Sequence, residues 1–411
     1  MELEIQYQQT SIGIFPNDWV IKKLIEIADI KSGGTPSTLM AEFWNGDIPW
    51  CTPTDITALN GNKYILSTNK KISHKGLLNS SAEILPINSI LMTSRATIGE
   101  CAINKTPMST NQGFKNFIPR EGINYEFLYY LLKIQKQGLT KLCSGSTFFE
   151  ISKSILSNYQ IALPLTKGEQ SSIANALSDV DTWIQSLSRL IEKKHRIKQG
   201  AMQQLLKPKE NWLEKRLGNV STLKARIGWQ GLTTSEYLKS GDYYLVTGTD
   251  FKNGYIDWEN CHFVDELRYK QDKNIQLKAN DVLVTKDGTI GKIALVPSLN
   301  KPATLNSGVF VIRPLNKTFD PIFFYYLLSS YFFIGFLNQL SAGSTINHLY
   351  QKDFVNFVFK TPPTLDEQVE IGRILFDMDI EISTLEKKLI KAQHIKQGMM
   401  QNLLTGRIRL I

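Results

Sequence analysis

The chain has 411 residues, of which 42% are hydrophobic and 21% charged, so it can hold two or three domains with their own cores. Lys and Arg outnumber Asp and Glu by 47 to 38, and the resulting net charge of +9 fits an anionic partner without requiring one. Four widely spaced cysteines argue against a disulfide framework or a zinc site and fit a cytoplasmic protein, and no apolar run reaches the roughly 20 residues of a membrane span.

Residues 1–165 form the first predicted domain. Gly and Pro interrupt its short apolar runs, such as SILMT at 89–93, and this pattern favours short strands and loops. One helix is predicted over 127–134 (FLYYLLKI). Residues 208–363 form the second predicted domain, with a matching helix over 323–328 (FFYYLL). Both domains are therefore predicted to be mixed α+β.

Residues 166–207 and 364–411 are each predicted to contain one long helix. The second helix is predicted to end at Gly406, before a short strand over 407–411. About 40 residues make a rod of about 60 Å. A single rod would expose its apolar seam to water, so we expect an intramolecular antiparallel coiled coil that separates the domains in a pseudo-two-fold arrangement. The apolar residues recur in steps of four and three, a heptad seam, made of Ile173, Leu177, Val180, Ile184, Leu187, Ile191 and Ile371, Leu375, Met378, Ile382, Leu385, Leu389.

The chain is a tandem duplication. Residues 169–206 and 367–404 align without a gap and share 17 of 38 positions, including Ile-Lys-Gln-Gly at 197–200 and 395–398. Shorter matches lie upstream. Thr-Ile-Gly occurs at 97–99 and 289–291, and Gly-Ser-Thr at 145–147 and 343–345. A repeat of this length is too long for a solenoid. It indicates a duplicated module that faces a two-part partner.

Two glycines, Gly200 and Gly398, lie inside the predicted helices, where Gly costs about 1 kcal/mol relative to Ala. They mark either a helix end or a close contact with a neighbouring helix or a partner protein, and the sequence leaves both interpretations open.

Motifs for catalysis are lacking. The GTIGK segment at 288–292 has two residues between its glycines, where a phosphate loop needs four, and no Ser or Thr follows its Lys. The five histidines are isolated. The repeated pairs Asp179/Asp181 and Asp377/Asp379 fall on the predicted helices, where solvated faces or interhelical contacts are favoured over a catalytic pair.

Binding is the function that remains. Basic residues cluster on both predicted helices, at 193–198 and 387–396, either as a solvated face or as contacts to phosphates. Polar loop residues at equivalent places in the two domains are candidates for reading base edges in the major groove, although ordinary turn residues are the alternative for each. These candidates are Ser94, Arg95, Ser146, Thr147, Lys286, Asp287, Ser344, Thr345 and Asn347.

Two variable domains, each followed by a long helix with the pattern E-Q…I-K-Q-G…L-L, resemble the specificity subunit of type I restriction–modification enzymes. The resemblance covers essentially the whole chain, and its specificity lies in the doubled order of short motifs. The residues that carry it are Glu169-Gln170, Ile197-Lys198-Gln199-Gly200, Leu205-Leu206 and their counterparts Glu367-Gln368, Ile395-Lys396-Gln397-Gly398, Leu403-Leu404.

The resemblance implies a non-catalytic subunit whose two domains each read one half of a bipartite, gapped, asymmetric target in double-stranded DNA. The helices would set the gap and dock two methyltransferase subunits, which restriction–translocation subunits would join. S-adenosylmethionine, ATP and Mg²⁺ would belong to those partners, and neither a metal nor a membrane would be needed by this chain. The residues expected at the helix pair or its partners are Ile173, Leu177, Ile184, Leu187, Gly200, Ile371, Leu375, Ile382, Leu385 and Gly398.

Two other functions are compatible with parts of the sequence. A nuclease or methyltransferase acting alone is disfavoured by the missing motifs, and methylation by the single chain would revive it. A scaffold that binds protein or ligand through paired domains would show no salt-sensitive association with DNA.

Overall fold

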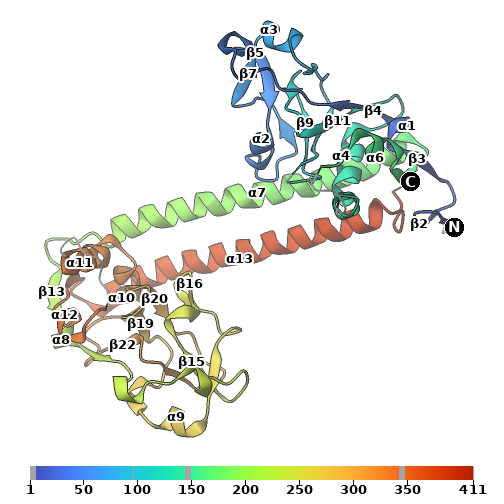
Figure 1. The fold of residues 1–411 in the computed structure, drawn as a ribbon. Helices are drawn as coiled ribbons and strands as arrows, with labels where there is room; N and C mark the ends of the chain where they lie inside the picture. The colour runs from blue at the N-terminus through green and yellow to red at the C-terminus, as the bar shows by residue number, and fades with distance from the viewer. Residues whose placement is uncertain (1–5, 96, 144–149, 342–347, 411) are drawn as a thin grey trace. The chain divides into compact units, whose positions relative to one another are not determined.

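The computed structural model describes residues 6–95, 97–143, 150–341 and 348–410. The chain divides into two compact units, Met1–Arg189 with Glu386–Ile411, and Leu190–Leu385. Two helices of 39 residues, α7 (Lys167–Leu205) and α13 (Leu365–Leu403), each contribute to both units. We call the α+β part before α7 the first domain and the α+β part between α7 and α13 the second domain (Figure 1).

The first domain is built on a five-stranded sheet with α4 (Tyr125–Ile134) packed against it. The side chain of Asn124 accepts hydrogen bonds from the backbone N–H groups of Glu126 and Phe127 and so begins this helix two residues before the predicted start. The sheet order is β4 (Ala28–Ser32), β11 (Phe114–Pro119), β8 (Ile90–Thr93), β9 (Cys101–Asn104), β6 (Tyr64–Ile65).

Smaller elements surround this sheet. They are the sheet β10 (Ser109–Thr110), β5 (Trp44–Cys51), β7 (Lys70–Ile72); the pair β12 (Gln160–Pro164), β3 (Trp19–Lys23); the hairpin β1 (Tyr7–Thr10), β2 (Gly13–Pro16); and the short helices α1 (Leu24–Ile27), α2 (Pro53–Thr57), α3 (His74–Leu78), α5 (Lys136–Lys141) and α6 (Lys153–Asn158).

The second domain repeats this topology. Its main sheet is β14 (Ser221–Lys224), β22 (Val309–Pro314), β19 (Val282–Thr285), β20 (Ile293–Leu295), and its smaller sheet is β18 (His262–Val264), β15 (Tyr243–Val246), β21 (Ala303–Leu305). The pair β13 (Leu213–Arg216), β23 (Val358–Thr361) matches β3 and β12. The other elements are α8 (Leu217–Val220), β16 (Phe251–Lys252), β17 (Tyr255–Ile256), α9 (Glu266–Lys270), α10 (Pro321–Leu328), α11 (Tyr331–Ser341) and α12 (Gln351–Phe354).

The predicted antiparallel pairing of the two long helices is confirmed, and the fold is α+β as expected (Figure 1). In the first unit, Ile173 and Leu177 near the start of α7 share a core with Leu403 at the end of α13. In the second unit, Ile371 and Leu375 near the start of α13 share a core with the residues that end α7. The start of each seam therefore also packs against its own domain.

Farther along the helices the seam stays largely shielded from water. Leu187 and Ile382 are buried, whereas Ile184 and Leu385 are half-buried. The two compact units divide each long helix between them, because each helix end packs with a different domain. The domain limits expected at residues 165, 207 and 363 stay a prediction.

Neither glycine of the repeated Ile-Lys-Gln-Gly motif breaks its helix. A Cβ atom added at Gly200 or Gly398 would meet nothing within 4 Å among the described residues. Both positions are helical, so the helix-end interpretation is wrong. Contact of either glycine with a partner protein stays a prediction.

The end of α13 differs in part from the prediction. The helix ends at Leu403, and Gly406 adopts a φ of +71° next to Pro16, where a Cβ would lie 2.5 Å from the proline ring. The strand predicted over 407–411 is wrong, because residues 407–410 are irregular. The Arg409 side chain instead forms ion pairs with Asp18 and Glu169.

None of the described helices is by itself long and apolar enough to cross a membrane; α10 and α11, bent by 55° at their break, meet the criteria of length and composition only as a pair.

We predict that Gly398→Ala raises the free energy of unfolding by about 1 kcal/mol, because alanine restricts the unfolded chain and the added methyl group meets open space. Thermal unfolding of the chain measures the change. Gly372→Ala in the same helix is the matched control, since its Cβ would lie 3.0 Å from the backbone N of Phe323, and it should lower stability. A Gly398→Ala chain that unfolds at a lower temperature than wild type would contradict the claim that the added methyl group meets open space.

Candidate functional site

Two hairpin loops occupy equivalent places in the domains, between β8 and β9 and between β19 and β20. In the first, the N–H of Gly99 donates to the carbonyl of Thr93 (2.9 Å), and in the second the N–H of Gly291 donates to that of Thr285 (3.0 Å). Both glycines have φ near +80°, a conformation that favours glycine. The repeated Thr-Ile-Gly motif therefore shapes a turn.

Each loop is also tied to the segment that follows the repeated Gly-Ser-Thr. The N–H of Ile151 donates to the carbonyl of Ser94 (3.0 Å), and the N–H of Leu349 donates to that of Lys286 (2.9 Å). These backbone contacts align Arg95 with Asp287 as equivalent positions. The scaffold around the loops is thus repeated while the side chains that it presents differ.

In the first domain, the loop carries a cation held by a carboxylate. Arg95 Nε lies 2.8 Å from Glu150 Oε2, and the buried Lys115 Nζ lies 3.2 Å from Glu150 Oε1. Burial raises the pKa of Glu150, but hydrogen bonds from Arg95 and Lys115 outweigh it and the net shift is downward. The Arg95 side chain is 47% exposed, and among the described residues no hydrogen bond engages its two terminal nitrogens.

In the second domain, the equivalent loop position carries a negative charge in place of a positive one. Asp287 stands where Arg95 does, and its Oδ1 contacts Nδ1 of His348, while its Oδ2 lies 3.4 Å from Lys286 Nζ. The His348 ring packs against Tyr350 with 4.5 Å between ring centroids. The two loops therefore offer different hydrogen-bonding groups to whatever they face.

The structure brings together some of the sequence candidates and not others. Ser94 is fully buried and its hydroxyl has no hydrogen-bond partner among the described residues, and the Lys286 side chain is only 15% exposed. Arg95 and Asp287 are the exposed members. The remaining candidates lie outside the described residues and are Ser146, Thr147, Ser344, Thr345 and Asn347.

A second repeated site joins the first domain to both long helices. Asp181 on α7 accepts a hydrogen bond from Tyr130 of α4 (2.6 Å to Oδ2), and its Oδ1 lies 2.5 Å from Lys396 Nζ on α13. The ammonium also lies 5.8 Å from the centre of the Tyr130 ring. Burial and the carboxylate of Asp181 both raise the pKa of Tyr130, so its hydroxyl stays a donor. We call this set the first junction.

The second domain contains the same set, here called the second junction. Tyr326 of α10 donates to Asp379 Oδ2 on α13 (2.6 Å), and Asp379 Oδ1 pairs with Lys198 on α7. Lys198 lies 5.4 Å from the centre of the Tyr326 ring. The Lys of each Ile-Lys-Gln-Gly motif therefore binds the Asp of the other repeat. For these two lysines, both sequence interpretations, a solvated face and a phosphate contact, missed the interhelical partner.

The repeated Glu-Gln motif fastens the start of each long helix. Gln170 accepts a hydrogen bond from the N–H of Asn124 (2.9 Å) and donates to the carbonyl of Pro164 (3.1 Å). Gln368 makes the same two contacts with Asp320 and Pro362, both at 3.0 Å. Each amide thus links the first turn of a long helix to the cap of the short helix in its own domain.

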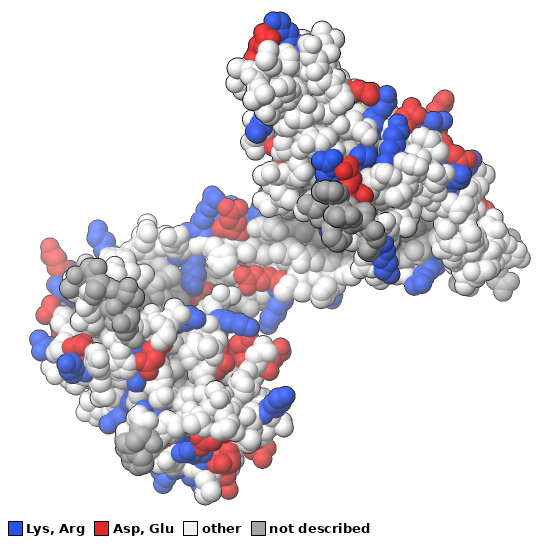
Figure 2. All heavy atoms as spheres, viewed as in Figure 1, with Lys and Arg blue, Asp and Glu red and all other residues white. Residues whose placement is uncertain are grey.

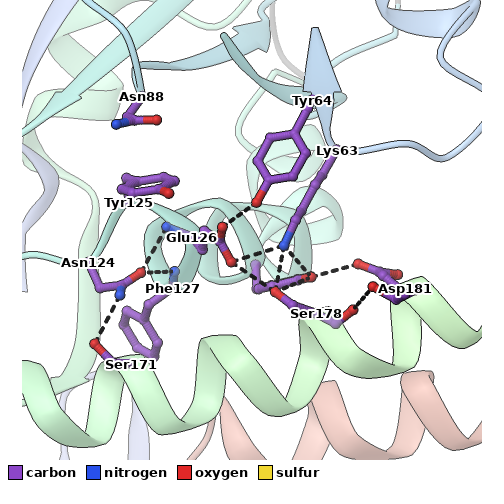
Figure 3. Close-up of polar contacts among 12 residues, drawn as sticks. Lys63, Tyr64, Asn88, Asn124, Tyr125, Glu126, Phe127, Ser171, Ser178 and Asp181 are labelled. Atoms are coloured by element: carbon purple, nitrogen blue, oxygen red, sulfur yellow. Dashed lines mark hydrogen bonds and ion pairs between the residues drawn. The ribbon is translucent and has the colours of Figure 1, made fainter. Parts of the chain in front are cut away.

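A buried polar cluster beside the first junction escaped sequence reasoning (Figure 3). Glu126 Oε2 lies 2.9 Å from Lys63 Nζ and accepts from Ser178 (2.8 Å), while Glu126 Oε1 accepts from Tyr64. Burial raises the pKa of Glu126, yet these hydrogen bonds from Tyr64, Lys63 and Ser178 outweigh it, so the net shift is downward. These residues come from three separate stretches of chain and share no spacing that could have revealed them.

The charged surface shows no single sign on the face in Figure 2, where Lys and Arg alternate with Asp and Glu. On the helices, part of the basic cluster is paired. Lys194 Nζ lies 2.6 Å from Glu381 Oε1, and Arg196 pairs with Glu192 one turn earlier. On this face the positive charges are therefore interspersed with negative ones.

Among the described residues, no group of three or more His, Cys, Asp and Glu side chains is placed to hold a metal ion. All four cysteines are buried, and burial raises the pKa of Cys101 to about 12, which keeps that thiol protonated. The polar side chains of the two junctions and of the Glu126 cluster pair with one another, an arrangement suited to positioning the helices and domains.

Comparison with known proteins agrees with this geometry. The model of the "Type I restriction modification DNA specificity domain" family matches twice, over residues 16–197 and 209–393. The MjaIX type I restriction enzyme specificity subunit of Methanocaldococcus jannaschii is 30% identical over 99% of this chain and 97% of its own length. The MjaVIII specificity subunit of the same organism is 26% identical over 96% and 94%.

Solved structures show the same fold. The S subunit of a type I restriction–modification system from M. genitalium superposes with a TM-score of 0.60 at 19% identity, covering 94% of this chain and 96% of that one. A chain from a structural study of complex assembly in a type I system gives a TM-score of 0.55 at 16% identity, with 96% and 99% covered.

The Glu126 cluster leads to a prediction on pH. Because the pKa of Glu126 is lowered in the folded chain, its contribution to stability is present above the ordinary value of 4.5 and is lost as the pH falls through the folded value. Glu126→Gln should therefore be less stable than wild type at pH 7, and the difference should shrink below about pH 4.5. Denaturant unfolding across this range measures it, with exposed Glu121→Gln as control. A difference that stays constant into acid would contradict the charged cluster.

Proposed function

Because this chain belongs to the family of DNA specificity subunits of type I restriction–modification systems, we propose that each of its two domains reads one half of a bipartite, gapped target in double-stranded DNA. The chain is the non-catalytic specificity component of such a system, with two recognition domains. The observation that carries the proposal is the pair of equivalent loops, built on one scaffold and presenting opposite charges.

Arg95 is the best-placed reader in the first domain. Glu150 binds its Nε, which orients the guanidinium plane, and no described residue engages either terminal nitrogen. Arginine in this state suits the two acceptors of guanine in the major groove. Ser94 lies too deep to reach DNA without movement of the loop, and the role of Ser146 and Thr147 stays a prediction.

Asp287 presents a carboxylate at the equivalent place in the second domain, and an acceptor suits the amino group of cytosine. His348 and Lys286 flank this carboxylate, while Ser344, Thr345 and Asn347 remain predicted contacts. Since the two loops differ, the two half-sites should differ, and the whole target should be asymmetric.

We further propose that the long helices set the gap between half-sites and dock two methyltransferase subunits, with restriction–translocation subunits joining them. The outer face of α7 carries Trp183, Leu190 and Ile197, exposed by 44%, 38% and 46% at steps of seven residues. An apolar stripe at heptad spacing suits packing against partner helices, and the open position of Gly200 lies beside it. S-adenosylmethionine, ATP and Mg²⁺ would be used by the partners, in the cytoplasm.

The test maps methylated bases genome-wide in cells that carry the methyltransferase partner with wild-type chain, no chain, Arg95→Ala or Arg120→Ala. Wild type should give one gapped, asymmetric motif that disappears without the chain. Arg95→Ala should relax one base position in one half, because a bidentate contact discriminates by about 1–3 kcal/mol. Arg120, equally exposed and paired with Asp29, is the control and should leave the motif intact. Loss of the chain without loss of any motif would contradict the proposal.

A further inference from the structure

We propose that the first and second junctions fix the register of α7 against α13, and that they thereby determine the number of base pairs between the half-sites. This inference rests on the proposed DNA-reading function. It assigns the spacing between the half-sites to the two Asp–Lys pairs and to the tyrosines that bind the aspartates. The residues concerned are Tyr130, Asp181, Lys396, Tyr326, Asp379 and Lys198.

The apolar seam alone selects the register poorly. Its members are Ile, Leu, Val and Met at heptad spacing, so a slip by one heptad replaces one aliphatic side chain by another of similar size. A charged pair that is shielded from water has no such substitute, because a slipped helix leaves the carboxylate without its cation. The side chains of Asp181 and Lys396 are only 10% and 17% exposed, so such a slip is strongly disfavoured.

Each junction also carries the register into a recognition domain. The second oxygen of each Asp accepts the hydroxyl proton of a tyrosine from the domain's own short helix, Tyr130 on α4 or Tyr326 on α10. The tyrosine ring lies under the same lysine. One carboxylate therefore holds three elements together, namely its own helix, the opposite helix and the domain.

The two junctions are reciprocal in the sequence. Asp181 and Lys198 are 17 positions apart on α7, and Asp379 and Lys396 are the same number of positions apart on α13. Because the helices are antiparallel, the interval on α7 lies alongside the interval on α13, and each begins where the other ends. Both junctions can form together only while the intervals are equal, so a change in one helix alone sacrifices one junction.

Aspartates two residues earlier in each helix provide an internal comparison. Asp179 and Asp377 share the repeat and the helices, but both are exposed and their carboxylates make no ion pair among the described residues. They are carboxylates on the same helices, two residues from the junction aspartates, but they do not contact the opposite helix through an ion pair among the described residues.

The test uses the assembled methyltransferase complex on a library of DNA duplexes in which the two half-sites are separated by gaps of different length. The double variant Asp181→Asn, Asp379→Asn should raise methylation of duplexes about three base pairs away from the native gap, the displacement produced by a one-heptad slip, relative to native duplexes, by about tenfold. The double variant Asp179→Asn, Asp377→Asn should keep the wild-type gap preference. A junction variant that methylates more slowly with an unchanged gap preference would overturn the inference, because a purely structural role lowers activity at every gap alike.

Tyr130→Phe with Tyr326→Phe provides a second variant that keeps the rings and the ion pairs, for use if the aspartate variant does not fold. It should broaden the gap preference in the same direction, and an unchanged preference would count against the junctions in the same way. If wild-type complex shows no gapped preference at all, the proposed function fails, whereas a gapped wild type with unchanged variants refutes only the inference.

An insertion provides an independent arm. Seven residues added after Leu187 and seven after Leu385 lengthen both intervals equally, by about 10 Å, which corresponds to about three base pairs. The matched double insertion should shift the preferred gap to one longer value. Either insertion alone should give no single preferred gap. A single insertion that retains the native gap would contradict the requirement that both junctions form together.

Discussion

The structure depends on two aspartates, Asp181 and Asp379, whose carboxylates each bind a lysine and a tyrosine while shielded from water. Removing Asp181 or Asp379 from solvent is costly, and the cost is offset only while lysine and tyrosine both remain in place. Breaking such a pair costs about 3–5 kcal/mol, although an apolar replacement of the whole set could be as stable. The contribution of the junctions is therefore one of register more than of net stability. It explains why Lys is kept in both copies of Ile-Lys-Gln-Gly.

Around these contacts, the residues that anchor the helices and shape the loops are the same in both halves, whereas the side chains that the loops present differ. Gln170 and Gln368 fasten the helices, and Gly99 and Gly291 shape the loops, in the same way in both halves. The side chains presented by the loops differ in sign. A protein that reads two unrelated half-sites at a fixed distance needs this division, since a change in a reading side chain then leaves the spacing untouched.

Much of the fold could be predicted from the sequence because its signals are local and periodic. The heptad seams, the short helices that carry the repeated tyrosines and the antiparallel pairing follow from apolar spacing and from the need of each rod for a partner. The strand predicted after Gly406 failed because Arg409 is bound by Asp18 and Glu169, which lie far away in the sequence. The absence of catalytic motifs was also visible, and it agrees with the family.

The site was less predictable because its contacts join distant segments. A heptad pattern shows which face of a helix is apolar but not that Lys198 meets Asp379, and no spacing relates Lys63 to Glu126. Ser94 has the sequence features of a polar loop residue, yet its side chain is fully buried. Burial of single polar residues depends on tertiary packing, which a sequence pattern does not encode.

The measurement that tests the account most directly is an exchange of residues 1–165 for the corresponding domain of another family member, followed by genome-wide mapping of methylated bases. The account predicts that one half of the target changes, while the other half and the gap stay as in wild type. A change in both halves, or an altered gap with the helices intact, would contradict independent reading by two domains on a spacer of fixed register.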